Sequence, residues 1–393
     1  MGVGHHTQRT PGGRRNGDTV KRMARNGRKI RYAVVGLGYI SQVAVLPAFG
    51  HADSNSKLTA LVSGDREKLK SLSRKYGVKL TYSYEQYADC LASGEVDAVY
   101  IALPNHMHRA YSEAAARAGK HILCEKPMAL DEADCEAMIA ESERAGVKLM
   151  IAYRLHFERG NLDAIHSVNS GKIGEPKIIT SVFSQQVKAG NSRLKKDVGG
   201  GALYDMGVYC INAARYLFRD EPEEVFAWNF GRDRNRFDEV PATTTGVLKF
   251  PDDKFASFTC SFGVADRSTF EVIGTKGVLK MDPAYEMAAA LKSEILLGEK
   301  KLKKTFAKRD QFAAELVYFS DCILNDKQPE PSGRDGLADV RIIQALLKSA
   351  ENNRPVSLNA PAIIRRPNMR QEIAMPAVKR APRLVNAQAP GQE

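Results

Sequence analysis

Cysteine is scarce in this chain and widely scattered. The 393 residues include six cysteines, at positions 90, 124, 135, 210, 260 and 322, with no C-x-x-C pair and no cluster of cysteine and histidine. A disulfide framework or a zinc site would need paired or closer spacings. We therefore expect free, buried thiols in a reducing compartment and no bound metal.

Long apolar runs are also missing. No stretch of the sequence approaches the roughly 20 apolar residues that a membrane-spanning helix needs. The first 28 residues are rich in Gly, Arg and Asn, and no apolar segment follows Arg14-Arg15 before Lys29. An export signal would need such a segment. We expect residues 1–28 to form a disordered basic arm and the protein to be cytoplasmic, with no membrane partner.

Positive charge is concentrated at the two ends of the chain. The formal net charge is +12, of which residues 1–29 carry +7 and residues 361–393 carry +4. The residues between them are nearly neutral, with a net charge of +1. A protein that binds nucleic acid in a folded groove concentrates cations there. The charge distribution therefore argues against a nucleic-acid partner.

A glycine-rich turn follows the first segment that has the character of a buried strand. The apolar run Ile30–Val35 leads directly into Gly36-Leu37-Gly38-Tyr39-Ile40-Ser41. Gly36 permits a tight turn, Gly38 lets a pyrophosphate approach the backbone, and the N–H groups of the next helix attract its charge. Many turns carry such a motif, but its place between a strand and a helix predicts a dinucleotide-binding Rossmann unit.

The end of the second expected strand, at Ser63, bears on which dinucleotide binds. NAD-binding proteins of this kind carry an acid there, which holds the ribose 2′-hydroxyl. Asp65 instead lies where an aspartate caps the following helix. A 2′-phosphate would suit the residues of this turn, which are Ser63 and Gly64 beside the cations Arg66 and Lys68. This composition favours NADP over NAD. The alternative is that both cations are ordinary solvated helix residues.

Expected strands and helices alternate up to residue 153. Strands are expected at 98–103, 121–124 and 148–153, with helices between them. This alternation predicts a parallel, doubly wound sheet over residues 29–153, with its ligand site at the carboxyl ends of the strands. Pro104, Asn105, Lys126 and Pro127 fall at such ends, where a proline can also simply stop a strand.

The pattern changes after residue 153. Closely spaced strands, expected at 177–187, 224–231, 243–250, 255–262, 269–273 and 277–281, indicate a mainly antiparallel sheet. Residues 154–358 are therefore expected to form a second α/β domain, whose helices at 311–324 and 336–352 return to the first domain. The proline-rich basic tail, 359–393, is expected to be unattached or to lie along a partner subunit.

Three glycines open a helical pattern in the middle of the second domain. Gly199-Gly200-Gly201 leads to Asp205 and Tyr209, which stand four residues apart. In an α-helix this spacing places both side chains on one face. A carboxylate and a phenol there can exchange a proton with a substrate hydroxyl. The plainer interpretation is a helix with a polar face and a half-buried tyrosine.

Five motifs together resemble those of one family. Gly36–Ser41, Pro104-Asn105 with His108, Glu125-Lys126-Pro127, Tyr153-Arg154 and Gly199–Tyr209 are similar, in this order, to the motifs of the glucose–fructose oxidoreductase / inositol dehydrogenase (Gfo/Idh/MocA) family. The resemblance covers residues 30–358. It implies a Rossmann domain followed by an α/β domain, whose open sheet commonly forms the interface of a homodimer or homotetramer.

The resemblance also implies a set of site residues. Lys126, Asp205 and Tyr209 match the catalytic positions, and we expect them to contact the substrate together with Arg154 and Arg193. The expected cofactor contacts are Gly36, Gly38, Tyr39, Ile40, Ser63, Gly64, Arg66, Lys68, Leu103, Pro104, Asn105, His108, Glu125, Lys126 and Arg154.

The residue type at position 209 indicates one branch of this family. Many family dehydrogenases have His at this position, whereas Tyr, with Ser63-Gly64 and Lys68, looks more like the glucose–fructose oxidoreductase branch, which uses NADP. We expect an NADP-dependent oxidoreductase of sugars or polyols, either a two-sugar transhydrogenase or an aldose dehydrogenase. The alternatives are an NAD-dependent, inositol-type polyol dehydrogenase and a non-catalytic dinucleotide-binding sensor or scaffold.

Overall fold

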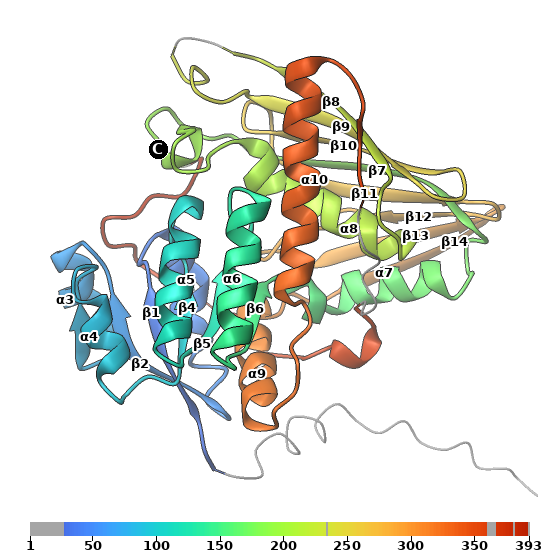
Figure 1. Cartoon of the computed structure of the whole chain (residues 1–393). Helices are drawn as coiled ribbons and strands as arrows, with labels where there is room; N and C mark the ends of the chain where they lie inside the picture. The colour runs from blue at the N-terminus through green and yellow to red at the C-terminus, as the bar shows by residue number, and fades with distance from the viewer. Residues whose placement is uncertain (1–26, 233–234, 360–366, 380–381, 392–393) are drawn as a thin grey trace, which may run out of the picture.

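Two sheets, each covered by helices, meet along a shared interior in the computed structural model (Figure 1). The structure describes residues 27–232, 235–359, 367–379 and 382–391. The predicted basic arm, 1–28, therefore lies outside the described residues except for its last two. Among the residues described, no helix has both the length and the apolar character needed to cross a bilayer.

The first sheet has six parallel strands in the order β3-β2-β1-β4-β5-β6. The strands are β1 (Ile30–Val35), β2 (Ser56–Val62), β3 (Leu80–Tyr82), β4 (Ala98–Ile101), β5 (His121–Glu125) and β6 (Leu149–Ala152). Helices α3 (Arg66–Tyr76), α4 (Tyr87–Ala92), α5 (His108–Arg117) and α6 (Glu132–Arg144) connect them. The predicted doubly wound parallel sheet is confirmed. The prediction missed β3, which is too short to show a pattern.

The second sheet has nine strands in the order β14-β13-β12-β11-β7-β10-β9-β8-β15, and its neighbours are antiparallel except for β7 and β10. The strands are β7 (Pro176–Ser184), β8 (Glu224–Phe230), β9 (Thr243–Phe250), β10 (Lys254–Ser261), β11 (Arg267–Gly274), β12 (Val278–Met281), β13 (Leu291–Leu297), β14 (Lys300–Phe306) and β15 (Val356–Ser357). The predicted mainly antiparallel sheet is confirmed. The hairpin of β13 and β14 was missed, because the lysine-rich β14 is exposed and lacks an apolar face.

Helices cover only one face of the second sheet. Helices α7 (Arg159–Asn169), α8 (Val208–Phe218) and α10 (Gly333–Asn352) pack against the strands on the side that faces the first domain (Figure 1). Side chains of β8 consequently alternate, with Val225 and Ala227 buried under α10 and Trp228 and Phe230 exposed on the other face. Strands with one solvated face are expected to alternate in this way.

Helix α9 (Gln311–Leu324) belongs by sequence to the second domain but lies against the first sheet. The hydroxyl of Tyr32 on β1 bonds to that of Ser320 at 2.8 Å, and the Asn55 amide donates to the Val317 carbonyl oxygen at 2.9 Å. Both contacts are buried, so the helix is fixed to the Rossmann domain by specific polar bonds as well as by apolar packing.

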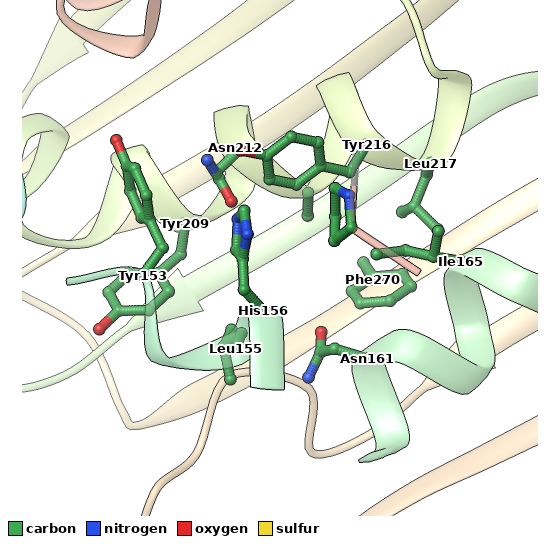
Figure 2. Close-up of a pocket in the computed structure, with 12 residues that line it drawn as sticks. Tyr153, Leu155, His156, Asn161, Ile165, Tyr209, Asn212, Tyr216, Leu217 and Phe270 are labelled. Carbon is green, nitrogen blue, oxygen red and sulfur yellow. The ribbon is translucent and has the colours of Figure 1, made fainter. Parts of the chain in front are cut away.

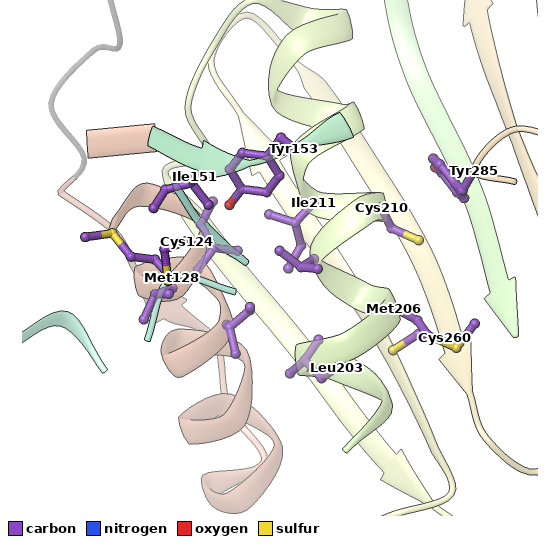
Figure 3. Packing of buried hydrophobic residues seen from close by; sticks show 14 of the residues in the cluster. Cys124, Met128, Ile151, Tyr153, Leu203, Met206, Cys210, Ile211, Cys260 and Tyr285 are labelled. Carbon is purple, nitrogen blue, oxygen red and sulfur yellow. The ribbon is translucent and has the colours of Figure 1, made fainter. Parts of the chain in front are cut away.

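Helix α10 joins the two domains from the other side. A side chain at Gly336 would meet Met128 at 2.8 Å and Ile151 at 2.9 Å, so glycine lets the helix approach the first sheet closely. Figure 3 shows Met128 and Ile151 facing Leu203 and Ile211 of the second domain, and all four belong to one buried cluster. The two domains therefore share a continuous apolar core.

The expectation of free, buried thiols is confirmed. All six cysteines are unpaired and buried. Cys124, Cys210 and Cys260 lie within the shared core (Figure 3), where burial raises the pKa of each thiol. These thiols therefore behave as small apolar side chains.

The C-terminal tail packs on its own chain, so the prediction of an unattached tail is wrong for its described parts, and its place along a partner subunit stays a prediction. Ile373 and Met375 are 7% and 6% exposed and belong to the core against the first sheet. The Ile373 amide donates to the Phe157 carbonyl oxygen at 3.3 Å. Residues 360–366, 380–381 and 392–393 of the predicted tail lie outside the described residues.

Glu315 is an unusual feature of the interface between α9 and the first domain. Its side chain is fully buried, and neither carboxylate oxygen has a hydrogen-bond partner among the described residues. The pKa of Glu315 is raised well above its ordinary value, first by burial and then by the charge of Glu125, whereas Arg154 opposes the shift. The folded protein therefore binds a proton that the unfolded chain releases above about pH 4.3, and this group makes the fold less stable as pH rises.

We expect Glu315→Gln to stabilise the protein increasingly with pH. The difference in unfolding free energy between the variant and the unchanged chain should grow by up to about 1.4 kcal/mol per pH unit above about pH 4.3. Urea unfolding at several pH values from about 5 to 8 measures it. Glu299→Gln, at an exposed turn between β13 and β14, is the control and should show no such trend. Parallel pH profiles for Glu315→Gln and the unchanged chain would contradict this account.

Candidate active site

A polar cleft of about 370 Å³ lies between the carboxyl ends of the first sheet and the start of α8. Ten of the predicted site residues line it: Tyr39, Ile40, Leu103, Asn105, Glu125, Lys126, Arg154, Arg193, Asp205 and Tyr209. The cleft thus lies where ligands bind in doubly wound sheets, and the second domain closes it from the other side.

The glycine-rich turn after β1 has the geometry that a pyrophosphate requires. Gly36 has φ +91°, and a side chain there would come within 2.4 Å of the Ala102 carbonyl oxygen. A side chain at Gly38 would meet no atom within 4 Å, so the backbone there is open to a ligand. Ser41 donates to the Gly36 carbonyl oxygen at 2.6 Å and begins a π-helical turn, η1 (Ser41–Val45), where sequence predicted an α-helix.

The end of β2 offers no free carboxylate to a ribose. One oxygen of Asp65 accepts from the amides of Glu67 and Lys68, at 2.9 and 3.0 Å, as the predicted helix cap. The other accepts from the Asn386 amide at 3.0 Å. These bonds, led by that from the Lys68 amide, lower the pKa of Asp65, so the carboxylate stays charged and occupied. Ser63 is buried and Arg66 is exposed at the same turn.

Asp205 is the centre of the polar side chains in the cleft. One carboxylate oxygen accepts from Lys126 Nζ at 3.0 Å, and the other accepts from Arg193 Nε at 2.8 Å. Lys126 Nζ also donates to the Asp205 backbone oxygen at 3.0 Å. The side chains of Lys126 and Asp205 are only 12% and 28% exposed, so the charges depend on one another. Lys126 follows β5, whereas the other two residues belong to the second domain.

Burial and the neighbouring charges oppose each other in setting these two pKa values. Burial alone would lower the pKa of Lys126, but the charges of Tyr209 and Asp205 raise it above its ordinary value. Burial would raise the pKa of Asp205, but Lys126 and Arg193 lower it well below its ordinary range. Both groups are therefore charged over the whole physiological pH range.

The three glycines explain how Arg193 reaches Asp205. A side chain at Gly200 would come within 2.4 Å of the Arg193 carbonyl oxygen, and one at Gly199 would overlap Leu130 at 2.3 Å. The Gly201 amide donates to the Arg193 carbonyl oxygen at 2.8 Å. The loop thus folds back on itself directly before Asp205. The Asn105 amide donates to the Gly199 carbonyl oxygen at 2.8 Å and ties this loop to the first domain.

Tyr209 lies between two cations. Arg154 Nε donates to its hydroxyl oxygen at 3.2 Å, and Lys126 Nζ lies 4.8 Å from the ring centroid. The ring also packs edge-on against Phe183, with centroids 5.3 Å apart. The hydroxyl has Arg154 as its hydrogen-bond partner, and Asp205 and Tyr209 both line the cleft, with Lys126 in contact with each. Asp205 lies in the π-helical turn η5 (Leu203–Gly207), and Tyr209 is the second residue of α8.

Arg154 is a site residue and not a surface cation. It is 6% exposed and donates to the Gln311 side chain and, at 2.6 Å, to the Tyr285 carbonyl oxygen. Sequence reasoning missed Gln311 and Tyr285, because neither lies in a motif. Gln311 is the first residue of α9, so the return of this helix to the first domain is what fixes the guanidinium.

His108 does not face the cleft, which corrects its prediction as a cofactor contact. The ring is fully buried, and its nitrogens bond to the carbonyl oxygens of Leu103, at 2.9 Å, and Pro127, at 3.0 Å. Burial lowers the pKa of His108, although these bonds to carbonyl oxygens act in the opposite direction. The imidazole instead holds the strand-end loops after β4 and β5 together. Pro104 is exposed at the first of these loops and is absent from the lining of the cleft.

A second, smaller cavity lies behind Tyr209. It has a volume of about 30 Å³ and a largely apolar lining, which includes Tyr153, His156, Tyr209 and Tyr216 (Figure 2). This volume holds about one water molecule and no sugar. The larger polar cleft is therefore the candidate substrate site.

The comparisons with known proteins agree with this geometry. Residues 30–153 match the family described as "Oxidoreductase family, NAD-binding Rossmann fold", and residues 162–280 match the "GFO/IDH/MocA C-terminal domain". The chain is 32% identical to the NADP(+) D-xylose 1-dehydrogenase of Haloarcula marismortui over 342 residues, which are 84% of this chain and 93% of that protein. It is 27% identical to the myo-inositol 2-dehydrogenase of Thermotoga maritima over 350 residues, 84% of this chain and 98% of that protein.

A solved structure extends the similarity to the whole fold. The aldose-aldose oxidoreductase of Caulobacter crescentus, crystallised with glycerol, is 39% identical and superposes with a TM-score of 0.80. The match covers 84% of this chain and 100% of that one. The predicted resemblance is thus confirmed: the chain is an oxidoreductase of the Gfo/Idh/MocA family, with an NAD(P)-binding Rossmann domain.

Proposed function

We propose that the protein is an NADP-dependent oxidoreductase that oxidises the CH–OH group of an aldose. The cluster of Lys126, Asp205 and Tyr209 with Arg154 and Arg193, at the carboxyl ends of the Rossmann strands, carries this proposal. The xylose dehydrogenase and the aldose-aldose oxidoreductase support an aldose as substrate. The intact cluster argues against a sensor that has lost its chemistry.

Proton transfer is the task of the protein, because the bound nicotinamide supplies the hydride acceptor. We assign Tyr209 as the base that takes the proton of the substrate hydroxyl. Arg154 Nε bonds to the Tyr209 hydroxyl oxygen and Lys126 Nζ lies over the ring, so two positive charges face the group that takes the proton. Asp205 orients Lys126 and Arg193, which each bond to one of its carboxylate oxygens.

NADP is proposed over NAD from the end of β2. The carboxylate that follows β2, that of Asp65, is occupied by two backbone amides and by Asn386, and Lys68 Nζ lies 3.9 Å from it. Ser63, Arg66 and Lys68 offer a hydroxyl and two cations to a 2′-phosphate, a ligand suited to such donors. The xylose dehydrogenase uses NADP according to its name, which supports the same choice.

We also propose a homodimer or homotetramer built on the open face of the second sheet. Five large apolar side chains, Trp228, Phe230, Val247, Phe255 and Val264, are between 36% and 54% exposed. All but the last lie on the adjacent strands β8, β9 and β10. Aromatic side chains exposed together over a contiguous apolar patch are typical of protein–protein interfaces.

Incubation with NADP and a panel of aldoses tests the activity. Absorbance of reduced nicotinamide near ~340 nm should appear with D-xylose or another aldose, and NAD should support a lower kcat/KM than NADP. Faster turnover with NAD would overturn the cofactor assignment. Dinucleotide binding without turnover on any aldose or polyol would show that the protein is a sensor.

Removal of the Tyr209 hydroxyl tests the proposed base. Tyr209→Phe should lower kcat by about a hundred- to ten-thousand-fold, because a positioned base contributes about that much, while the Kd for NADP changes little. Lys126→Met should have a similar effect. Tyr204→Phe is the matched control, since Tyr204 lies on the π-helical turn directly before α8 and its hydroxyl donates to the Leu130 carbonyl oxygen at 2.8 Å. Near-normal kcat in both site variants would refute the assignment.

Introducing negative charge on the open face of the second sheet tests the proposed homodimer or homotetramer. The double variant Trp228→Glu and Phe230→Glu should shift the protein to monomers, because carboxylates at the centre of an interface lose hydration without gaining partners. Light scattering after gel filtration measures the mass. Lys301→Glu, exposed on β14 at the far end of the sheet, is the control. An unchanged mass for the double variant would place the interface elsewhere.

A further inference from the structure

The C-terminal segment 382–391 runs across the dinucleotide-binding side of the first domain. In Figure 1 it is part of the dark red segment that passes β1 and ends beside the loop that precedes α8. Both family matches end earlier, at residues 153 and 280. These two family models therefore assign no role to this segment.

The segment is fixed to the phosphate-binding turn itself. The Val385 amide donates to Gln42 Oε1 at 2.8 Å, and Gln42 Nε2 donates to the Val385 carbonyl oxygen at 2.8 Å. Gln42 is 1% exposed and also donates to the Leu37 carbonyl oxygen, at 3.0 Å, within the glycine-rich turn. One buried side chain thus joins the tail to the backbone that is built to receive a pyrophosphate.

Two further contacts follow Val385 along the chain. Asn386 Nδ2 donates to Asp65 at 3.0 Å, at the turn proposed to hold the 2′-phosphate. The Lys188 amide donates to the Pro390 carbonyl oxygen at 3.1 Å, and Pro390 lines the polar cleft with Lys126 and Tyr209. The segment therefore spans from the ribose end of the dinucleotide site to its nicotinamide end.

The composition of the segment fits a phosphate-bearing ligand. Residues 382–391 read Pro-Arg-Leu-Val-Asn-Ala-Gln-Ala-Pro-Gly, with one cation, two carboxamides and no acid. Arg383, Asn386 and Gln388 are exposed, whereas Val385 packs against the core of the first domain. The apolar side chain anchors the segment, Asn386 bonds to Asp65, and Arg383 and Gln388 are exposed beside the site.

We propose that residues 382–391 are part of the dinucleotide-binding site, as a strap that lies over bound NADP and slows its release. This inference rests on the proposed function. Release of a dinucleotide held beneath the strap requires the bonds at Asp65, Gln42 and Lys188 to break first. Since a few net hydrogen bonds together correspond to a factor of ten or more, release is expected to slow by at least about tenfold.

Release of NADPH from the full chain and from a chain that ends at Lys379 tests the strap. Each protein is loaded with NADPH, and the loss of its fluorescence is followed after an excess of NADP is added. The shortened chain keeps Ile373 and Met375, which pack in the core. We expect it to release NADPH at least about tenfold faster than the full chain.

Substitutions in the full chain keep the test independent of the truncation. Val385→Pro removes the amide that donates to Gln42, and Asn386→Asp places a carboxylate beside Asp65. Both should accelerate release in the same direction as the truncation. Lys379→Ala, at an exposed residue before the strap, is the control and should leave the release rate unchanged.

The possible failures are distinguishable. Equal release rates in the full and shortened chains would overturn the strap and leave the proposed function intact. Tighter binding of NADPH by the shortened chain would also overturn it, because the segment would then compete with the dinucleotide. Failure of every form to bind NADPH would refute the proposed cofactor, and the strap with it.

Discussion

The paired charges on Asp205 hold the two domains in the arrangement that forms the cleft. Lys126, from the end of β5, and Arg193, from the loop before α8, each bond to one oxygen of this carboxylate. Since these side chains are mostly withdrawn from water, removal of any one leaves the others with unbalanced charge. The direction of the lysine and of Arg193 in the cleft therefore depends on a single carboxylate.

The other side of the cleft is fixed by contacts that cross the molecule. Tyr209 is held by Arg154, which is held in turn by Gln311 at the start of α9 and by the backbone of Tyr285. These residues come from four separate parts of the chain. The geometry of the tyrosine thus depends on helix α9, which packs on the first sheet through Ser320 and Val317. A site at a junction of domains is open to a ligand and rigid at the same time.

The sequence predicts the regular parts of this fold well. Strands such as Ile30–Val35 are buried on both faces and therefore apolar except at Arg31, and the strands of the second sheet alternate because one face is covered by the described helices. The prediction failed where a segment is short or exposed, as at β3 and β14. It also failed at the two π-helical turns, which do not differ in composition from α-helix and yet occur at the glycine-rich turn and at Asp205.

By itself, the sequence determined the order of the domains, the dinucleotide-binding turn and the side chains that a site would need, because glycine spacing and strand periodicity are local properties of the chain. Tertiary structure decided their partners. Packing places His108 between two loops and not in the cleft. It also makes Arg154 the hydrogen-bond partner of the Tyr209 hydroxyl and brings Val385 against the phosphate-binding turn. Such pairings join residues far apart in the chain, and they depend on how helices and sheets pack, which no local pattern records.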